Sequence, residues 1–438
     1  ILFNVFIQLL FSQQKLNNNT THPNWIEYGN IYEVNIRQYT SQGTFKAFEA
    51  HLPRLKRMGV QTLWFMPINP ISKVDRKGSL GSYYAVSNYR AINPEFGNME
   101  DWKNLVLKAH QMGFKVVIDW VPCHTGADHY WLKTNKNFYE LDEKGNPRSL
   151  YDWTDTRKLN YNNKQLRDSM IQAMLFWVKN SDIDGFRCDV AGEVPDDFWK
   201  VCIPTLNKTK KLFWLAEADK PSLHTDGFDA SYGWQEFGIM KDIATGAKNA
   251  LSIDTLLQKL EKNYPNNFLR LLFTSNHDEN SWNKADFETM PNESHAPFAV
   301  LTQTMKNTIP LIYSGQEEPI KRAISFFEKD SIKFRKYERH KFYATLLYTR
   351  KRLPFNNKAI INRLFSSNQH IYAFTRTFQG SAATVIVNLS NAPQKFTFKN
   401  IDKKLIGTKG IDIFNNNQPI VFLEKNELPA WGYQIILH

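Results

Sequence analysis

Runs of apolar residues alternate with helix-like segments from about residue 30 to residue 350. Most runs are continuous, which is typical of parallel strands buried on both faces. We expect eight strands, at residues 31–36, 62–67, 115–121, 185–190, 213–218, 227–232, 269–276 and 309–315. Between them, apolar residues recur at helical spacing, as over residues 45–58 and 166–178, and Asn98 is placed to cap a helix that runs to Gly113.

Eight alternations of strand and helix predict an α/β fold, a (β/α)₈ TIM barrel over residues 23–356. A doubly wound open sheet is the alternative, and it predicts a glycine-rich phosphate loop after an early strand. The sequence contains no such loop. We therefore predict the barrel.

Two segments depart from the alternation. After the third strand, an insert of about residues 124–163 is rich in Trp, Tyr, Asn and Asp, and we expect it over the active face of the barrel. In residues 357–438 the helical period gives way to alternating strands with Asn-rich turns, which predict a C-terminal antiparallel β-sandwich domain. We expect its strands at residues 371–377, 382–389, 395–398, 419–423 and 432–437.

The first 14 residues are mostly apolar and are followed by a polar stretch. The run is too short to span a bilayer and resembles the apolar core of a secretory signal. We interpret residues 1–22 as a signal-peptide remnant and linker, which predicts a secreted or periplasmic protein. The alternative is an N-terminal element that packs on the barrel. No other segment favours stable membrane insertion.

Composition narrows the function further. The chain has 438 residues, of which 42% are hydrophobic, a net charge of +12 and a pI near 9.3. Lys and Arg are scattered and no nucleic-acid motif is present, so we expect a solvated basic surface and no nucleic-acid partner. Cys123, Cys188 and Cys202 are odd in number in a long chain, so we expect buried thiols and no disulfide framework. Oligomeric state is not predicted.

Acidic residues close four of the expected strands. Asp119, Asp189, Glu217 and Asp278 each follow an apolar run. A carboxylate in such a place is costly unless it faces a cavity or a partner. We expect the last three to converge on one site, because cleavage of a glycosidic bond needs one acid to donate a proton and another to attack or stabilise the sugar cation.

These motifs resemble glycoside hydrolase family 13, the α-amylase family, over nearly the whole chain. The residues that carry the resemblance are 119–124 (Asp-Trp-Val-Pro-Cys-His), 185–191 (Gly-Phe-Arg-Cys-Asp-Val-Ala), Glu217 and 276–278 (Asn-His-Asp), with flanking blocks at 63–68, 84–97 and 309–316. The resemblance implies that Asp189 is the nucleophile, Glu217 the general acid and base, and Asp278 the acid that stabilises the transition state. Without the resemblance, a structural ion pair, a salt-bridged strand end and a helix cap are ordinary alternatives for these acids.

Substrate-binding residues are implied in the same way. Tyr84 would stack on the sugar beside the nucleophile, and His124 and His277 would hydrogen-bond it. Arg187 would lie beside Asp189 and lower the pKa of its carboxyl, with Asp119 orienting the guanidinium. The family's retaining mechanism implies nucleophile and acid carboxyls about 5–5.5 Å apart.

One block departs from the family pattern. Cys123 stands where many members have an Asn whose carbonyl binds calcium, and a thiol is a poor ligand for that ion. Asn160 stands where an Asp is typical, and Glu193 lies near another ligand position. We predict no calcium at this site and no required cofactor, and leave open a cation site elsewhere in the insert.

The expected substrate is an α-glucan. The compact insert and the short chain resemble those of small bacterial α-amylases, which implies hydrolysis of α-1,4-glucosidic bonds in starch-type glucans or maltooligosaccharides. Transglycosylation, or hydrolysis or isomerisation of another α-glucoside (cyclodextrin, pullulan, trehalose), is the alternative. A non-catalytic sugar-binding relative is a remote one, because such a chain should lack one of the three acids.

Overall fold

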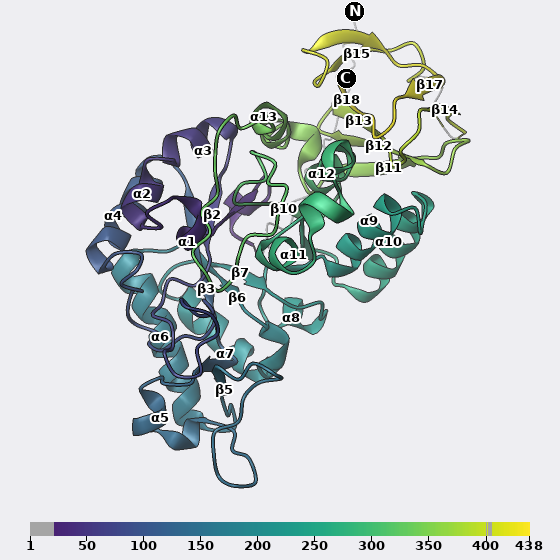
Figure 1. Ribbon diagram of the computed structural model, residues 1–438. Coiled ribbons are helices and arrows are strands. Elements are labelled where there is room, and N and C mark those ends of the chain that lie inside the picture. The colour runs from purple at the N-terminus through teal and green to yellow at the C-terminus, as the bar shows by residue number, and fades with distance from the viewer. Residues whose placement is uncertain (1–21, 400, 402–404) are drawn as a thin grey trace, which may run out of the picture.

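Eight parallel strands close into a barrel at the centre of the protein, which confirms the predicted fold (Figure 1). The computed structural model describes residues 22–399, 401 and 405–438; the predicted signal-peptide remnant therefore lies outside the described residues, apart from His22. In the barrel the strands follow the order β1-β10-β9-β8-β7-β6-β3-β2. Their bounds are β1 Ile31–Val34, β2 Thr62–Phe65, β3 Lys115–Trp120, β6 Gly185–Cys188, β7 Phe213–Ala216, β8 Ala230–Tyr232, β9 Leu269–Leu272 and β10 Thr308–Tyr313.

Helices surround the barrel and cover its apolar outer face. They are α1 Ile36–Tyr39, α2 Phe45–Glu49, α3 Leu52–Met58, α4 Met99–Gln111, α6 Lys164–Ser181, α7 Asp196–Asn207, α8 Ser222–Thr225, α9 Trp234–Ala244, α10 Leu251–Asn263, α11 His277–Ser281, α12 His295–Thr304 and α13 His340–Thr349. Asn98 caps α4 in a full capping box, as predicted. The single helix expected over residues 45–58 is two helices, because Pro53 occupies the first turn of α3 and favours a helix start. Within the described part of the chain, no helix combines the length and apolar character needed to cross a bilayer.

The insert after β3 forms a separate lobe at one end of the molecule (Figure 1). It begins with β4 (His124–Gly126), which pairs antiparallel with β5 (Thr156–Lys158), and it carries the short helix α5 (Trp131–Thr134) between them. Of its aromatic side chains, Trp131 and Tyr139 are buried, whereas Tyr151 is 61% exposed. The pairing of β4 with β5 closes the base of the lobe beside the strand ends of the barrel.

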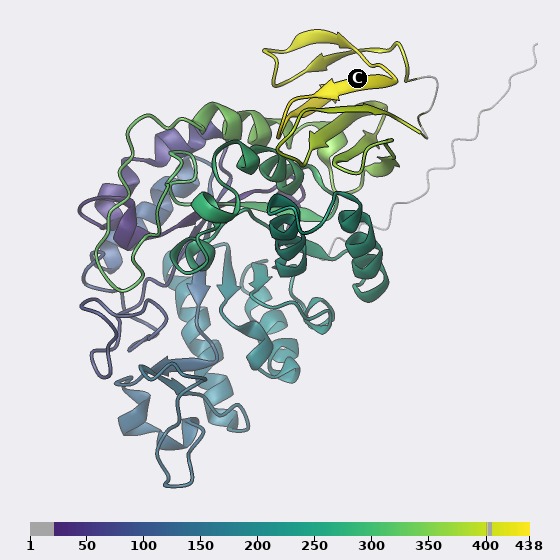
Figure 2. The same cartoon turned by 45° about the vertical axis from the view of Figure 1, so that its right-hand side comes forward.

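An antiparallel sheet forms the C-terminal domain, at the opposite end of the molecule from the insert (Figure 1 and Figure 2). Its order is β11-β12-β13-β18-β15-β16, and β14 and β17 form a second, two-stranded layer. The bounds are β11 Ile360–Leu364, β12 Ile371–Phe378, β13 Ser381–Asn388, β14 Gln394–Thr397, β15 Lys409–Asp412, β16 Gln418–Val421, β17 Lys425–Leu428 and β18 Tyr433–Leu437. Three of these strands, β11, β15 and β17, were absent from the sequence prediction. Phe396 and Leu428 of the small layer pack on Ile386 and Ile436 of the large one.

The sheet and the barrel share one apolar core. Helix α12 packs against β13 and β18, and Phe298 of α12 belongs to the same buried cluster as Tyr372 and Val385 of the sheet. Arg376 is fully buried at this junction and donates to three backbone carbonyls, of Thr304 (2.5 Å), Pro354 (2.7 Å) and Asn356 (2.7 Å). The two domains are therefore joined by packing and by buried hydrogen bonds.

Candidate active site

A cleft of about 570 Å³ lies at the carboxyl ends of the barrel strands. All three predicted catalytic acids line it, together with Tyr84, His124 and His277. The rest of its lining combines five aromatic side chains (Trp153, Trp234, Trp282, Phe326 and Phe327) with mostly polar ones, among them Lys77, Asp152 and Asp155. The volume lies in the range of small-molecule binding pockets, and in a (β/α)₈ barrel this end of the strands is where active sites occur.

Arg187 is the centre of the polar cluster beneath the cleft. It points inward from β6 and is 0% exposed. Its Nη1 lies 2.8 Å from Asp119 Oδ1 and 2.8 Å from Asp189 Oδ1, and its Nη2 lies 2.7 Å from Glu217 Oε1. The planar guanidinium thus fixes three carboxylates that come from three strands. Asp119 orients Arg187, as the sequence predicted.

Aromatic rings enclose this guanidinium. The carbon Cζ of Arg187 lies 5.2 Å, 5.6 Å and 5.5 Å from the ring centres of Trp64, Tyr84 and Tyr232. Arg187 Nε also donates to the Tyr232 hydroxyl at 3.1 Å. Because the rings exclude water, the charge of Arg187 acts on its carboxylates at low local dielectric.

A backbone hydrogen bond links the segment of Asp189, the candidate nucleophile, to Glu217, the candidate acid. Val190, the residue after Asp189, donates its N–H to Glu217 Oε2 at 2.8 Å. Val190 has φ 43° and ψ 43°, a left-handed conformation that is unfavourable for a β-branched residue. Such strain costs on the order of 1–3 kcal/mol and persists where the surroundings hold it in place. Here it directs the Val190 N–H toward Glu217.

The pKa of Asp189 differs from the sequence expectation. Burial raises it well above its ordinary value, the negative charge of Glu217 adds to the rise, and Arg187 opposes both. Arg187 does lower the pKa of Asp189, as expected, but burial and the charge of Glu217 outweigh its effect. One guanidinium faces three carboxylates, so its charge is shared. Burial likewise raises the pKa of Asp119 to about 6.

Asp278 stands on the cleft side of α11. Its side chain is 44% exposed, much more than those of Asp189 and Glu217 at 8% and 10%. The residue that caps α11 is Asn276, whose Oδ1 accepts the N–H of Glu279 at 2.8 Å. The capping alternative for Asp278 is therefore wrong, and its carboxylate faces the cleft.

His277 links the cleft to the barrel interior. Its Nδ1 lies 2.5 Å from Glu33 Oε1, and its Nε2 lies 2.8 Å from the Tyr84 hydroxyl and 3.3 Å from Asp278 Oδ2. Burial opposes the charged imidazole, but Asp278 and Glu33 outweigh it and raise the pKa of His277 to about 9. Both ring nitrogens therefore donate at neutral pH.

Tyr84 completes this chain of hydrogen bonds. Its hydroxyl accepts from His277 and donates to Asp119 Oδ2 at 3.1 Å. Its ring stacks on His277 at 5.5 Å and on Phe326 at 6.2 Å. The position at the cleft wall is consistent with the stacking role that the sequence predicts.

His124 also lies at the cleft wall, but both of its ring nitrogens have protein partners. Nε2 donates to the Tyr84 carbonyl at 3.1 Å, and Nδ1 lies 3.1 Å from Cys123 Sγ. Burial lowers the pKa of His124 to about 4, so the ring is neutral. A hydrogen bond from His124 to a sugar stays a prediction, and it requires exchange of one of these partners.

The residues at the expected calcium position do not fit a cage for that ion. The Cys123 thiol faces His124, and Asn160 Oδ1 accepts the N–H of Asn162 at 3.1 Å. Glu193 accepts from the Tyr151 hydroxyl at 2.6 Å, and the Lys158 ammonium lies 3.9 Å from it. Calcium prefers several free oxygen ligands, which these contacts do not leave available. The absence of structural calcium stays a prediction.

Several residues of the site were not found from the sequence. Glu33, Trp64 and Tyr232 contact His277, Asp119 and Arg187 from inside the barrel, while Trp282 and Phe326 line the cleft. Glu33 gave one usable signal, an acid within an expected buried strand. The others look like ordinary core or surface aromatics in the sequence.

The fold and the site together indicate the class of protein. A closed (β/α)₈ barrel with three acids at one aromatic cleft, two of them on a single guanidinium, is suited to cleaving bonds between sugars. The model of the catalytic domain of α-amylases matches residues 15–158 and 149–237, just over half of the chain.

Known proteins agree with this class. The chain is 24% identical to α-amylase 2 of Dictyoglomus thermophilum over 88% of this chain and 74% of that protein. It is 26% identical to neopullulanase 2 of Thermoactinomyces vulgaris over 79% of this chain and 62% of that protein. The crystal structure of an α-amylase from Lactobacillus plantarum superimposes with a TM-score of 0.84 and 27% identity, over 94% of this chain and 99% of that one. The chain belongs to the α-amylase family, glycoside hydrolase family 13, and is an enzyme of O-glycosyl bonds.

Proposed function

We propose that this protein hydrolyses α-1,4-glucosidic bonds in starch-type glucans or maltooligosaccharides, with retention of configuration. The observation that carries the proposal is the convergence of Asp189, Glu217 and Asp278 on one cleft, although they are far apart in the sequence. Asp189 and Glu217 contact the same guanidinium, which keeps nucleophile and acid beside one another.

Each acid has a distinct role in the proposed reaction. Glu217 protonates the glycosidic oxygen while Asp189 attacks the anomeric carbon, so that the bond to the leaving sugar breaks and a covalent glycosyl-enzyme forms. Glu217 then takes a proton from a water molecule, which attacks the same carbon and releases Asp189. Asp278, the most exposed of the three, faces the sugar and stabilises its positive charge in the transition state.

Exposed aromatic residues support a chain-like substrate. Trp282 is 53% exposed, Trp234 is 37% exposed, and both line the cleft. Trp282 is braced by Phe326 at 5.4 Å and Phe327 at 5.8 Å. Flat apolar faces along the same cleft as the acids suit successive pyranose rings. Transfer of the glycosyl group to a sugar, or action on cyclodextrin, pullulan or trehalose, is the alternative, and the neopullulanase relative keeps it open.

We also propose that the enzyme is secreted or periplasmic. The apolar run of residues 1–14 followed by a polar stretch supports this. Fractionation of producing cells checks it, and activity confined to the cytoplasm would contradict it.

The first experiment compares products from maltoheptaose, cyclodextrin, pullulan and trehalose, with the anomeric form of the first product read by NMR. We expect α-configured short maltooligosaccharides from maltoheptaose. Asp189→Asn should lower kcat by at least about 10³-fold, because no nucleophile remains. Asp242→Asn, which changes a surface acid paired with Lys248, is the matched control and should retain activity. Inverted products, or an active Asp189→Asn variant, would overturn the proposal.

A further inference from the structure

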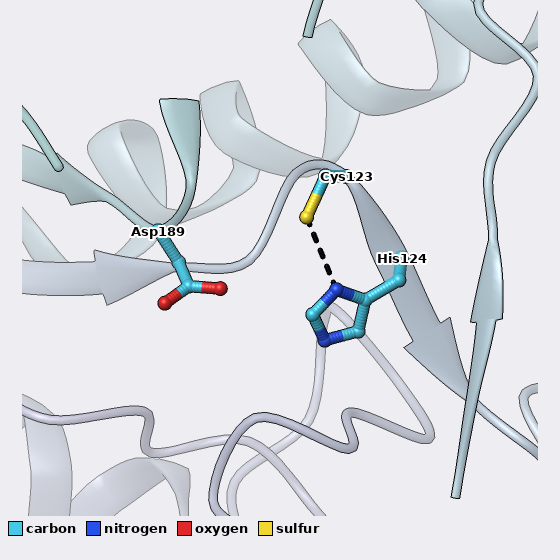
Figure 3. A group of neighbouring side chains, drawn as sticks. All are labelled: Cys123, His124 and Asp189. Atoms are coloured by element: carbon cyan, nitrogen blue, oxygen red, sulfur yellow. Dashed lines mark hydrogen bonds between the residues drawn. The ribbon is translucent and has the colours of Figure 1, made fainter. Parts of the chain in front are cut away.

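We propose that Cys123, His124 and Asp189 form a binding site for a thiophilic divalent cation such as Zn²⁺, and that the bound ion blocks the nucleophile. Sγ of Cys123, a ring nitrogen of His124 and a carboxylate oxygen of Asp189 all lie within 4.8 Å of one another (Figure 3). The inference that binding inhibits the enzyme rests on the proposed role of Asp189; the inference that the cation binds does not.

The three donors follow two barrel strands and face one another. Cys123 lies between β3 and β4, His124 is the first residue of β4, and Asp189 directly follows β6. In Figure 3 the sulfur of Cys123 points at the imidazole, and one oxygen of Asp189 extends toward the same ring. A thiolate, an imidazole and a carboxylate are all ligands that Zn²⁺ takes, at about 2.0–2.3 Å each. Donors within 4.8 Å of one another need only small movements to reach that geometry.

The imidazole is already oriented for metal binding. Nε2 of His124 donates to the Tyr84 carbonyl, so Nδ1 carries the free lone pair and accepts from the Cys123 thiol at 3.1 Å. An N–H bonded to a backbone carbonyl is the arrangement that fixes metal-ligating histidines in their tautomer. A proton now lies between Sγ and Nδ1, in the place that the cation would take.

Binding exchanges this proton for the cation. Burial, together with the charges of Asp189 and Glu217, raises the pKa of the Cys123 thiol well above its ordinary value, so it is protonated without a metal. A divalent cation displaces the proton to solvent and forms the sulfur–metal bond, with no change of oxidation state. Burial disfavours any charge at this place, but the carboxylates of Asp189 and Glu217 attract a positive ion to it.

The donor set selects the kind of ion. Sulfur and imidazole ligands favour Zn²⁺ and its borderline or soft relatives, whereas Ca²⁺ requires oxygen ligands. His124 and Asp189 line the cleft, whereas Cys123 is only 2% exposed and lies behind them. The ion therefore reaches the site from the cleft. A fourth position facing the cleft is left for water. While Asp189 holds the ion, it cannot attack a sugar.

The experiment titrates the purified enzyme with Co²⁺ and with Zn²⁺. We expect one ion per chain, a near-ultraviolet thiolate-to-Co²⁺ absorption band, and inhibition by Zn²⁺ that EDTA reverses and substrate opposes. Ca²⁺ should give no competing signal. Cys123→Ala should abolish the band and weaken binding at least about tenfold, since even the partners of metal ligands contribute 10–100-fold.

Cys202→Ala is the matched control. Cys202 is also buried, but it contacts Met174 in the core, so this variant should keep the band and the inhibition. Each variant is compared with its own metal-free rate, and circular dichroism checks its fold. A Co²⁺ band that survives in Cys123→Ala would overturn the site. Binding without inhibition would leave the site intact and contradict the role of Asp189.

Discussion

At the scale of single residues, Arg187 decides how the site is built. It is fully buried and contacts Asp119, Asp189 and Glu217 with one planar group. Lysine offers a point charge on a flexible chain and cannot hold three carboxylates in fixed directions. The four acids could be predicted from the sequence because each follows an apolar run. Glu33 gave only the signal of an acid within a buried strand, and its partner could not be predicted, because His277 lies 244 residues away.

The first prediction concerns the charge of His277. Asp278 and Glu33 together raise the pKa of His277 to about 9; Glu33→Gln keeps a hydrogen-bond acceptor for Nδ1 but removes one of these two negative charges. We expect that pKa to fall by about 1–3 units, the usual effect of a neighbouring opposite charge. The imidazole ¹⁵N shifts of histidine-labelled protein measure it.

The raised pKa of His277 also makes the stability of the fold depend on pH, in a direction that can be predicted. A raised histidine pKa stabilises the fold fully below the unfolded value of 6.5, and the contribution disappears as the pH rises through about 9. In Glu33→Gln this loss should occur at lower pH. Glu236→Gln, which removes another buried acid beside Arg270, is the control and should leave His277 unchanged. An unaltered His277 pKa in Glu33→Gln would contradict the assignment of its partner.

At the scale of elements, the sequence was most informative where burial is continuous. All eight barrel strands were predicted because each is a buried run in which most residues are apolar. In contrast, β15 (Lys-Gly-Ile-Asp) and β17 (Lys-Asn-Glu-Leu) were missed because they contain too few apolar residues to show alternation. The helix caps could be predicted from the sequence only in part: Asn98 was predicted, and Asn276 was not.

These two caps give the second prediction. Asn98→Ala and Asn276→Ala each remove a side chain that accepts from the first turn of a helix, so each should cost about 1 kcal/mol of unfolding free energy. Only Asn276 precedes His277 and Asp278. We expect kcat/KM to fall in Asn276→Ala and to stay unchanged in Asn98→Ala. Urea unfolding and initial rates measure the two effects, and equal rates in both variants would show that the cap does not position the acid.

At the scale of the whole molecule, barrel and sheet behave as one body because they share a core. Their junction contains Arg376, and burial lowers the pKa of its guanidinium to about 10. Three backbone carbonyls accept hydrogen bonds from this guanidinium. The presence of the sheet could be predicted from the alternating pattern, but this junction could not, because the sequence does not reveal which carbonyls meet the guanidinium.

The third prediction tests the junction. Arg376→Met should lower the unfolding free energy by at least about 3 kcal/mol, because it leaves buried carbonyls unpaired. Lys395→Met removes a charge from an exposed side chain of the same domain and should cost little. Calorimetry of the wild type should show a single transition for both domains. Two separate transitions, or equal effects of the two substitutions, would contradict a shared core.

The way the insert is attached has a practical consequence. Its chain leaves and rejoins the barrel through the paired strands β4 and β5, where Gly126 lies opposite Thr156. Residues 127–155 therefore form a module with one narrow base, and random libraries or grafted loops confined to that span would alter which oligosaccharides are accepted without rebuilding the catalytic scaffold. Laboratory evolution of new specificities is best begun there.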